Sequence, residues 1–137
     1  MNTLILDAAL GTQLAVNGEE LPDWKKSLWS AHALINKPEA ILKIHLDNIE
    51  AGADVITTSN YYATPIILAK DSTKHDYKEL VKRALDLVQE AIKISGKDCL
   101  IAGSFPPINV SFRPDLTGTE DELEEFYGSL GEIYKDC

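Results

Sequence analysis

Polar side chains follow each of three short apolar runs in this chain. Asp7 follows the run 4–6, and the polar stretch 57–60 follows the run 55–56. Ser104 follows the run 100–102 after one glycine. A carboxylate pairs with an ammonium group, whereas hydroxyl and backbone N–H groups bind a carboxylate. Brought together, these residues would suit a small zwitterionic ligand.

These polar residues also have purely structural interpretations. Asp7 either caps a helical turn beginning near residues 8–10 or contacts a ligand, and the spacing does not separate the two. Thr57 and Thr58 are common β-strand residues. The glycines at positions 11 and 103 suit turns, and the tyrosines at 61 and 62 are more typical of packing than of ligand binding. From these residues alone, the chain is an α/β domain with a candidate site at its strand ends.

Cysteine and histidine spacing indicates no metal site. The two cysteines, Cys99 and Cys137, lie far apart, and neither belongs to a C-x-x-C pair. A disulfide framework or a zinc knuckle made by this chain alone is therefore not expected. Cys99 precedes an apolar run and fits a small core residue. Three histidines lack metal-ligand spacing and are interpreted as structural or solvent-facing: His32, His45 and His75.

Helical patterns separate the apolar runs. The first covers 38–49, where proline and glutamate suit the first turn and Gly52 can end the helix. The second runs from about 76 to 94, has apolar residues at helical spacing and is followed by Gly96. The third begins at Thr119, which forms a capping-box pattern with the glutamate three residues later.

The alternation of strand and helix predicts a parallel sheet with right-handed crossovers. The runs 4–6, 54–58 and 100–102 should be adjacent parallel strands with helices on one face, and their composition is typical of buried strands. Asp7, Thr58 and Ser104 should then lie at one end of the sheet. A doubly wound open sheet and a (β/α)8 barrel both fit, although no G-x-G-x-x-G supports a dinucleotide site. A barrel normally needs about 250 residues, so three βα units would be under half of one.

Composition excludes several classes of protein. The chain has 137 residues, of which 45% are apolar and 26% charged, as in a soluble globular domain. No apolar run approaches the roughly 20 residues that span a membrane, and the N-terminus does not resemble a signal peptide, so a cytoplasmic location is expected. The net charge of −9 argues against nucleic-acid binding. The acidic residues of 115–137 fit the wet side of a surface helix.

An ordered set of motifs resembles the homocysteine S-methyltransferase family. Residues 4–14 resemble its opening, L-L-D-G-[GA]-x-G-T-x-L, and residues 28–31 its L-W-S-A segment. Residues 57–64 resemble its T-x-x-Y-x-A-T signature, and residues 101–107 its G-S-x-x-P segment. The A-G-A-D-V-I of residues 51–56 occurs in many barrels, but the ordered set spans nearly the whole chain.

The resemblance implies the N-terminal portion, about three βα units, of a (β/α)8 TIM barrel. Residues 1–137 would then be an incomplete homocysteine-binding domain without its C-terminal half. Family members move a methyl group from a donor such as S-methylmethionine, S-adenosylmethionine, betaine or methylcobalamin to homocysteine, giving methionine. Zinc on three cysteines activates the thiol in the family. Cys99 and Cys137 match neither cysteine motif, so zinc is expected for the full-length family and not for this chain alone, which should be inactive.

The motifs also imply substrate-binding residues. Asp7 matches the aspartate that faces the homocysteine amino group, and Ala8 sits where a backbone amide approaches the substrate. Thr58 matches the strand-two threonine, Tyr62 a position near the methyl donor, and Ser104 the third strand end. Ala8 replaces the usual glycine, which restricts the backbone at that turn.

Further interpretations remain open at the level of sequence. Residues 106–107, two prolines, replace the family's G-P-Y form and change the donor-side loop. Besides a methyltransferase fragment, the chain could be a non-catalytic amino-acid-binding or interaction module derived from that barrel. A different βα-barrel enzyme is a third interpretation, against which the ordered motifs count. The expected partners are homocysteine and a methyl donor, without nucleic acid or membrane. An open sheet edge also predicts self-association.

Overall fold

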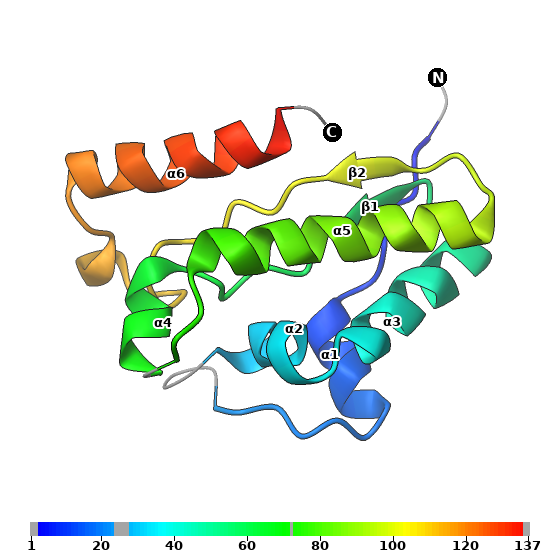
Figure 1. The fold of residues 1–137 in the computed structure, drawn as a ribbon, viewed down its shortest axis with the longest axis horizontal. Coiled ribbons are helices and arrows are strands. Elements are labelled where there is room, and N and C mark those ends of the chain that lie inside the picture. Colours follow the sequence, from blue (N-terminus) through cyan, green and yellow to red (C-terminus); the bar gives the residue numbers. More distant parts are fainter. Residues whose placement is uncertain (1–2, 24–27, 72, 136–137) are drawn as a thin grey trace.

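The sheet consists of parallel strands, as the sequence predicts. The computed structural model describes residues 3–23, 28–71 and 73–135 (Figure 1). Strand β1, Val55–Thr57, pairs in parallel with β2, Leu100–Ala102, and Val55 lies opposite Leu100. Leu6 forms a single parallel bridge with Val55. The three apolar runs are therefore adjacent and parallel, with the first run the least regular.

Helices fill the connections between the strands. The three predicted helices are present, and shorter helices lie before and between them. In chain order they are α1 (Leu10–Val16), η1 (Trp29–Ala31), α2 (His32–Asn36), α3 (Pro38–Glu50), α4 (Pro65–Lys70), α5 (Tyr77–Ser95), η2 (Pro114–Leu116) and α6 (Glu120–Tyr134).

Local sequence signals set the ends of the long helices. Pro38 occupies the first turn of α3, where its missing N–H has no helical partner to lose. Gly96 ends α5 in the left-handed conformation, at a φ of 65°. Thr119 forms the predicted capping box of α6, because its hydroxyl accepts from Glu122 N and the Glu122 carboxylate accepts from Thr119 N. These contacts satisfy backbone groups that the helices leave unpaired.

Helices α3 and α5 cover one face of the sheet (Figure 1). Ile56 is fully buried and packs with Ile49, Val88 and Ala91 from these two helices. Successive strand residues point to opposite faces, so Leu100, next to Ile101 in β2, points away from the helices and is 58% exposed. The prediction of buried strands is thus wrong for part of the sheet, including residues 4–6, which are 57–61% exposed. Among the described residues, α3 and α5 bury one face of the sheet, and residues 4–6 and Leu100 have no comparable cover.

Two further apolar clusters attach the remaining elements. One joins α1, α2, α3 and α4 beside the carboxyl ends of the strands, and Leu14, Leu34 and Ile44 are fully buried in it. The other joins α6 to α5 through Phe126 and Leu130. None of the helices in the described part of the chain is long and apolar enough to cross a membrane.

Candidate functional site

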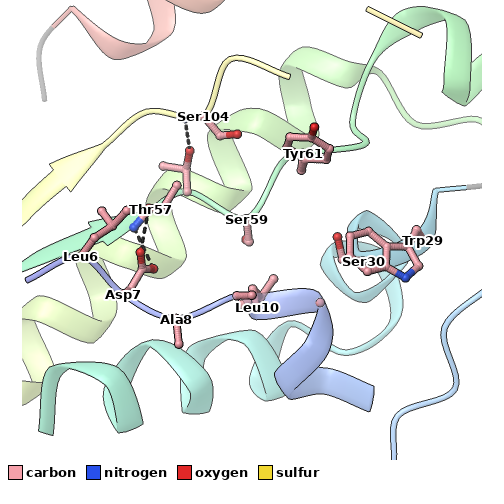
Figure 2. A pocket seen from close by; sticks show the side chains of 13 residues that line it. Leu6, Asp7, Ala8, Leu10, Trp29, Ser30, Thr57, Ser59, Tyr61 and Ser104 are labelled. Carbon is pink, nitrogen blue, oxygen red and sulfur yellow. Dashed lines mark hydrogen bonds between the residues drawn. The ribbon is translucent and has the colours of Figure 1, made fainter. Parts of the chain in front are cut away.

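A cavity of about 450 Å³ lies at the carboxyl ends of the strands, next to the start of α1 (Figure 2). In parallel α/β folds this is the edge where ligands bind. Residues from all three strand ends line it, together with the segment entering α1 and part of η1: Leu6, Asp7, Ala8, Ala9, Leu10, Gly11, Trp29, Ser30, Thr57, Thr58, Ser59, Tyr61 and Ser104. The expected placement of Asp7, Thr58 and Ser104 at one end of the sheet is therefore found.

Asp7 joins two neighbouring strand ends. Its carboxylate accepts hydrogen bonds from Thr57 N at 3.0 Å and from Thr57 Oγ1 at 2.7 Å (Figure 2). Ala9 is the N-cap residue of α1, and no side chain caps that helix. The capping interpretation of Asp7 is therefore wrong. A carboxylate has about four lone-pair sites, so the two bonds to Thr57 leave acceptor capacity for a ligand in the cavity.

The segment from Ala8 to Gly11 forms one wall of the cavity. Ala8 is exposed there, but its N–H points to α3 and donates to Asn48 Oδ1 at 3.3 Å. Gly11 lies inside α1, so its interpretation as a turn residue is wrong. A Cβ atom at Gly11 would lie 2.5 Å from the Trp29 ring. Glycine is needed here because the indole packs directly against the helix.

A hydrogen-bond network links the ends of β1 and β2 to α6. The buried Thr58 hydroxyl accepts from Ser104 N at 2.8 Å and donates to Asn60 Oδ1 at 2.7 Å. Asn60 Nδ2 donates to Ser104 O at 3.1 Å, and Tyr134 OH donates to Asn60 Oδ1 at 2.9 Å. Through its bonds to Ser104 N and Asn60, Thr58 therefore holds the two strand ends together. The Tyr134 ring also packs directly on Gly103, where a Cβ atom would lie 2.7 Å from it.

Tyr62 lies apart from the other predicted site residues. It is 4% exposed, belongs to the main apolar cluster and packs edge-on against Trp29, with ring centroids 5.9 Å apart. It does not line the 450 Å³ cavity, whereas Tyr61 does. A smaller adjoining cavity of about 240 Å³ is lined by Tyr62 together with Trp29, Tyr61, Ser111 and Phe112. Trp29 and Tyr61 thus border both spaces.

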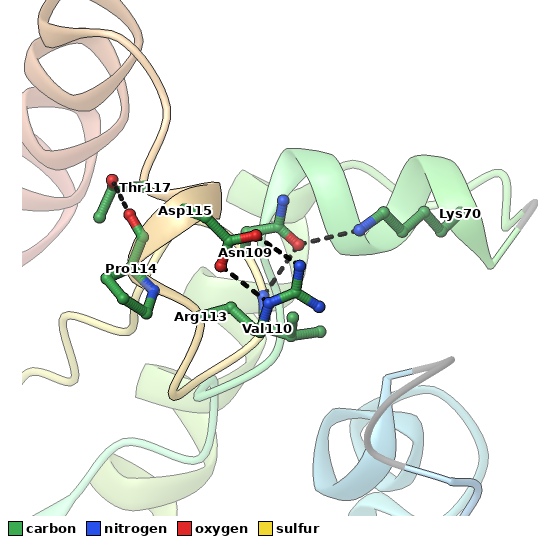
Figure 3. Close-up of polar contacts among 7 residues, drawn as sticks. All are labelled: Lys70, Asn109, Val110, Arg113, Pro114, Asp115 and Thr117. Carbon is green, nitrogen blue, oxygen red and sulfur yellow. Dashed lines mark hydrogen bonds and ion pairs between the residues drawn. The ribbon is translucent and has the colours of Figure 1, made fainter.

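Polar contacts fix the loop that carries Phe112 (Figure 3). Lys70 Nζ donates to Asn109 Oδ1 at 2.8 Å. Arg113 Nε donates to Asp115 Oδ1 at 2.8 Å, and this hydrogen bond lowers the pKa of the Asp115 carboxyl. Phe112 itself has a φ of 63° and is 93% exposed. A positive φ is unfavourable for such a residue. The polar contacts on either side of Phe112 keep its exposed ring at the smaller cavity in spite of this backbone conformation.

Two buried polar side chains have no partner for their polar atoms in the described part of the chain, and His45 takes the structural one of the two interpretations that its sequence left open. Ser59 is 5% exposed, lines the larger cavity, and its hydroxyl has no hydrogen-bond partner among the described residues. His45 of α3 is 1% exposed, and neither ring nitrogen has a partner within the same residues. Burial lowers the pKa of His45 to about 4, while the charge of Asp7 acts in the opposite direction. Ser59 does belong to the polar stretch 57–60, but that pattern does not distinguish it from its neighbours.

The described residues do not fit a zinc site. Within residues 3–23, 28–71 and 73–135, no three His, Cys, Asp or Glu side chains gather closely enough to hold a metal ion. Cys99 precedes β2 and therefore lies at the amino end of the sheet, with its Sγ 3.5 Å from Ala53 O. The cavity lies at the other end. Cys137 is outside the described residues.

Comparison with known proteins identifies the family. The homocysteine S-methyltransferase family model matches residues 4–134. Homocysteine S-methyltransferase 4 of Zea mays is 38% identical over 91 residues, covering 66% of this chain and 26% of the relative. Homocysteine S-methyltransferase of Escherichia coli (strain K12) is 35% identical over 111 residues, covering 76% of this chain and 35% of the relative.

A solved structure shows the same fold. The metallated form of the homocysteine methyltransferase MmuM from Escherichia coli superposes with a TM-score of 0.80 at 29% sequence identity. The match covers 99% of this chain and 51% of that one, so this chain spans about half of the solved chain and a smaller share of the curated relatives. Together with the parallel βα order, these matches show that the chain belongs to the homocysteine S-methyltransferase family and folds as part of a (β/α)8 barrel.

Proposed function

We propose that this chain forms the amino-acid-binding part of an enzyme that transfers a methyl group to the sulfur of homocysteine, giving methionine. The observation that carries this proposal is the Asp7 carboxylate at the edge of a strand-end cavity. Its oxygens keep acceptor capacity beyond the two bonds to Thr57. A volume of about 450 Å³ lies within the range of small-molecule sites.

Asp7 would bind the ammonium group of homocysteine through a charge-assisted hydrogen bond. The Thr58 hydroxyl is already engaged by Ser104 N and Asn60. We therefore assign Thr58 to positioning the strand ends that carry the site. Ala8 and Ser104 line the same cavity as Asp7. Each assignment rests on the position of the residue at the cavity together with the family motif.

The adjoining aromatic cavity suits a methyl donor that carries a positive charge. S-methylmethionine and S-adenosylmethionine are sulfonium ions, and betaine is a quaternary ammonium ion. Aromatic faces attract such cations, and the small cavity is lined by Trp29, Tyr61, Tyr62 and Phe112. Because Trp29 and Tyr61 border both cavities, a donor bound there would lie beside the homocysteine. This keeps Tyr62 on the donor side of the proposed site.

In the proposed reaction homocysteine loses its thiol proton to a base, and the resulting thiolate sulfur attacks the methyl carbon of the donor. A new C–S bond forms, and the bond between the methyl group and the donor atom breaks, leaving its electron pair on that atom. A thiol with a pKa near the cysteine value of about 8.5 is mostly protonated at neutral pH. The described residues do not provide the zinc ligands implied for the family. We therefore assign activation of the thiol to residues other than those described.

The test combines ligand binding with complementation. Purified chain is titrated with L-homocysteine by calorimetry, then incubated with zinc and S-methylmethionine while bound metal and methionine are measured. We expect saturable homocysteine binding, without stoichiometric zinc or methionine. Adding the remaining half of the Escherichia coli relative as a separate polypeptide should supply the rest of the barrel and produce methionine. Absence of saturable homocysteine binding would contradict the proposal.

The same experiment separates the alternative function. A non-catalytic amino-acid-binding module would bind homocysteine and form no methionine in any combination.

Self-association is a further expectation, because Leu4, Leu6 and Leu100 are each about 60% exposed and lie on neighbouring strands. Sedimentation of the purified chain at several concentrations measures it. Loss of self-association on adding the complementary half would indicate that the same sheet surface is covered in both cases.

A further inference from the structure

Ser59 stands out among the polar residues of the cavity because its hydroxyl is buried and unpaired. The residue is 5% exposed, and its Oγ has no hydrogen-bond partner among the described residues. Its side chain points from the loop after β1 into the space beside the segment that enters α1 (Figure 2). Leaving a buried hydroxyl unpaired is unfavourable for folding. A ligand in the cavity would provide the missing partner.

The neighbouring polar groups are already engaged within the protein. The Asp7 carboxylate accepts from Thr57, and the Thr58 hydroxyl is bonded to both Ser104 N and Asn60. An amino acid in the cavity brings one positive and one negative group. Asp7 can bind the positive group, but its negative charge repels the other. The carboxylate of the ligand therefore needs a hydrogen-bond donor elsewhere on the wall.

We propose that the Ser59 hydroxyl donates a hydrogen bond to the carboxylate of the bound amino acid, while Asp7 binds its ammonium group. This inference rests on the proposed function. It makes Ser59 a determinant of specificity for ligands that carry a carboxylate. A hydroxyl that bonds an ionised carboxylate forms a stronger hydrogen bond than one between neutral groups. The cost of the unpaired hydroxyl in the free protein is thereby offset when the ligand binds.

The test compares two ligands that differ only in the carboxylate. L-homocysteine and 3-aminopropane-1-thiol share the thiol and the amine, and each is titrated into the 137-residue chain and its Ser59→Ala and Asp7→Asn variants. We expect Ser59→Ala to weaken homocysteine binding by about 10-fold and to leave the amine within about 2-fold. Asp7→Asn should weaken binding of both ligands.

Thermal unfolding without ligand provides an independent measurement. Since the Ser59 hydroxyl has no partner to lose within the described part of the chain, Ser59→Ala should keep or raise the midpoint temperature. The matched control is Ser95→Ala at the end of α5, whose hydroxyl donates to Ile92 O at 2.8 Å. That variant should lower the midpoint temperature and leave binding of both ligands unchanged.

Each result either supports or overturns the assignment. Unchanged homocysteine binding in Ser59→Ala would mean that the hydroxyl contacts only water, and equal weakening of both ligands would mean that it does not read the carboxylate. Either result overturns the role of Ser59 while the Asp7→Asn effect still supports the proposed function. If the unsubstituted chain binds neither ligand, the proposed function fails and the role of Ser59 fails with it.

Discussion

Two aspartates connect the first strand run to β1, one at each end of the sheet. At the carboxyl end, Asp7 accepts from Thr57 N at 3.0 Å. At the amino end, Asp54 accepts from Ile5 N at 2.9 Å. Both side chains are half-buried, and both bind a backbone N–H of the neighbouring run. They differ in their surroundings, because Asp7 lines the 450 Å³ cavity and Asp54 does not.

The comparison separates a structural contribution from a functional one. Linking the two strand runs is common to both carboxylates and cannot by itself indicate ligand binding. Among the described residues, the 450 Å³ cavity and the unpaired Ser59 hydroxyl lie at the end that carries Asp7, and the aromatic residues of the smaller cavity adjoin them. At the other end, Cys99 and Lys97 contact backbone carbonyl groups, those of Ala53 and Ile49. Binding should therefore depend on one aspartate, and stability on both.

The largest expected effect is on ligand binding. Asp7→Asn removes the charge that would bind the ammonium group, so homocysteine affinity should fall by roughly 10- to 100-fold. Asp54→Asn should change it by no more than about 2-fold. Both variants should lose about 1 kcal/mol of unfolding free energy, because each weakens a hydrogen bond to a charged acceptor. Calorimetric titration and urea denaturation of both variants measure the two quantities.

Equal effects at the two ends would break the comparison. If Asp7→Asn and Asp54→Asn weakened homocysteine binding to the same extent, the loss would follow from stability alone. Asp7 would then be a strand-linking residue like Asp54. Asp7→Glu provides a further check, since it keeps the charge and displaces it by one methylene. It should retain more affinity than Asp7→Asn even if it is the less stable variant.

Local sequence signals predicted those parts of the structure that depend on neighbouring residues. The capping box at Thr119 needs only residues three apart, and the end of α5 needs only a glycine at position 96. The strand ends were also predictable, because an apolar run followed by polar residues marks the rim of a parallel sheet. This is why Asp7 and Ser104 could be identified before the fold was known.

Features set by tertiary packing could not be predicted in this way. Ser59 and Thr58 are adjacent hydroxyl residues, and only the fold shows that one is engaged by Ser104 N and the other is unpaired. His45 shares the apolar side of its helix with Ile41 and Ile44, which favours burial, but only the fold shows that neither ring nitrogen finds a partner among the described residues. Leu6 is apolar yet 61% exposed. An apolar residue type indicates that burial would be favourable, but the side chain is buried only where another part of the structure packs against it.

His45 adds a second expected difference between the two ends of the sheet. Burial lowers the pKa of His45 to about 4 from 6.5, so the unfolded chain binds a proton first as the pH falls. The contribution of His45 to stability is therefore fully present above pH 6.5 and is lost as the pH falls toward 4. At pH 5 the loss from this residue should be about 2 kcal/mol. His45→Leu should remove that part of the acid sensitivity, as measured by urea denaturation between pH 4.5 and 7.5.

The aspartates extend the comparison, because the charge of Asp7 raises the pKa of His45. Asp7→Asn should therefore steepen the loss of stability toward low pH. If Asp54→Asn steepened it equally, the effect would not come from the charge of Asp7 acting on His45.

The smallest expected effect concerns the network behind the cavity. Tyr134→Phe removes a hydroxyl that lies 2.9 Å from Asn60 Oδ1 and 3.0 Å from Thr58 Oγ1, and it should cost about 1 kcal/mol of unfolding free energy. The ring remains to pack against Gly103. Tyr127→Phe, on the same helix, loses a longer bond to Pro106 O at 3.2 Å and should cost less.

Homocysteine binding distinguishes the two tyrosine variants more sharply than stability does. Thr58 keeps its bonds to Ser104 N and Asn60 in Tyr134→Phe, so the strand ends stay joined, although Asn60 is held less firmly. Affinity should fall by about 3-fold in Tyr134→Phe, because the loop that carries Ser59 is anchored through Asn60, and should not change in Tyr127→Phe. If both variants bound homocysteine as well as the unsubstituted chain, α6 would stabilise the carboxyl end of the sheet without contributing to its ligand site.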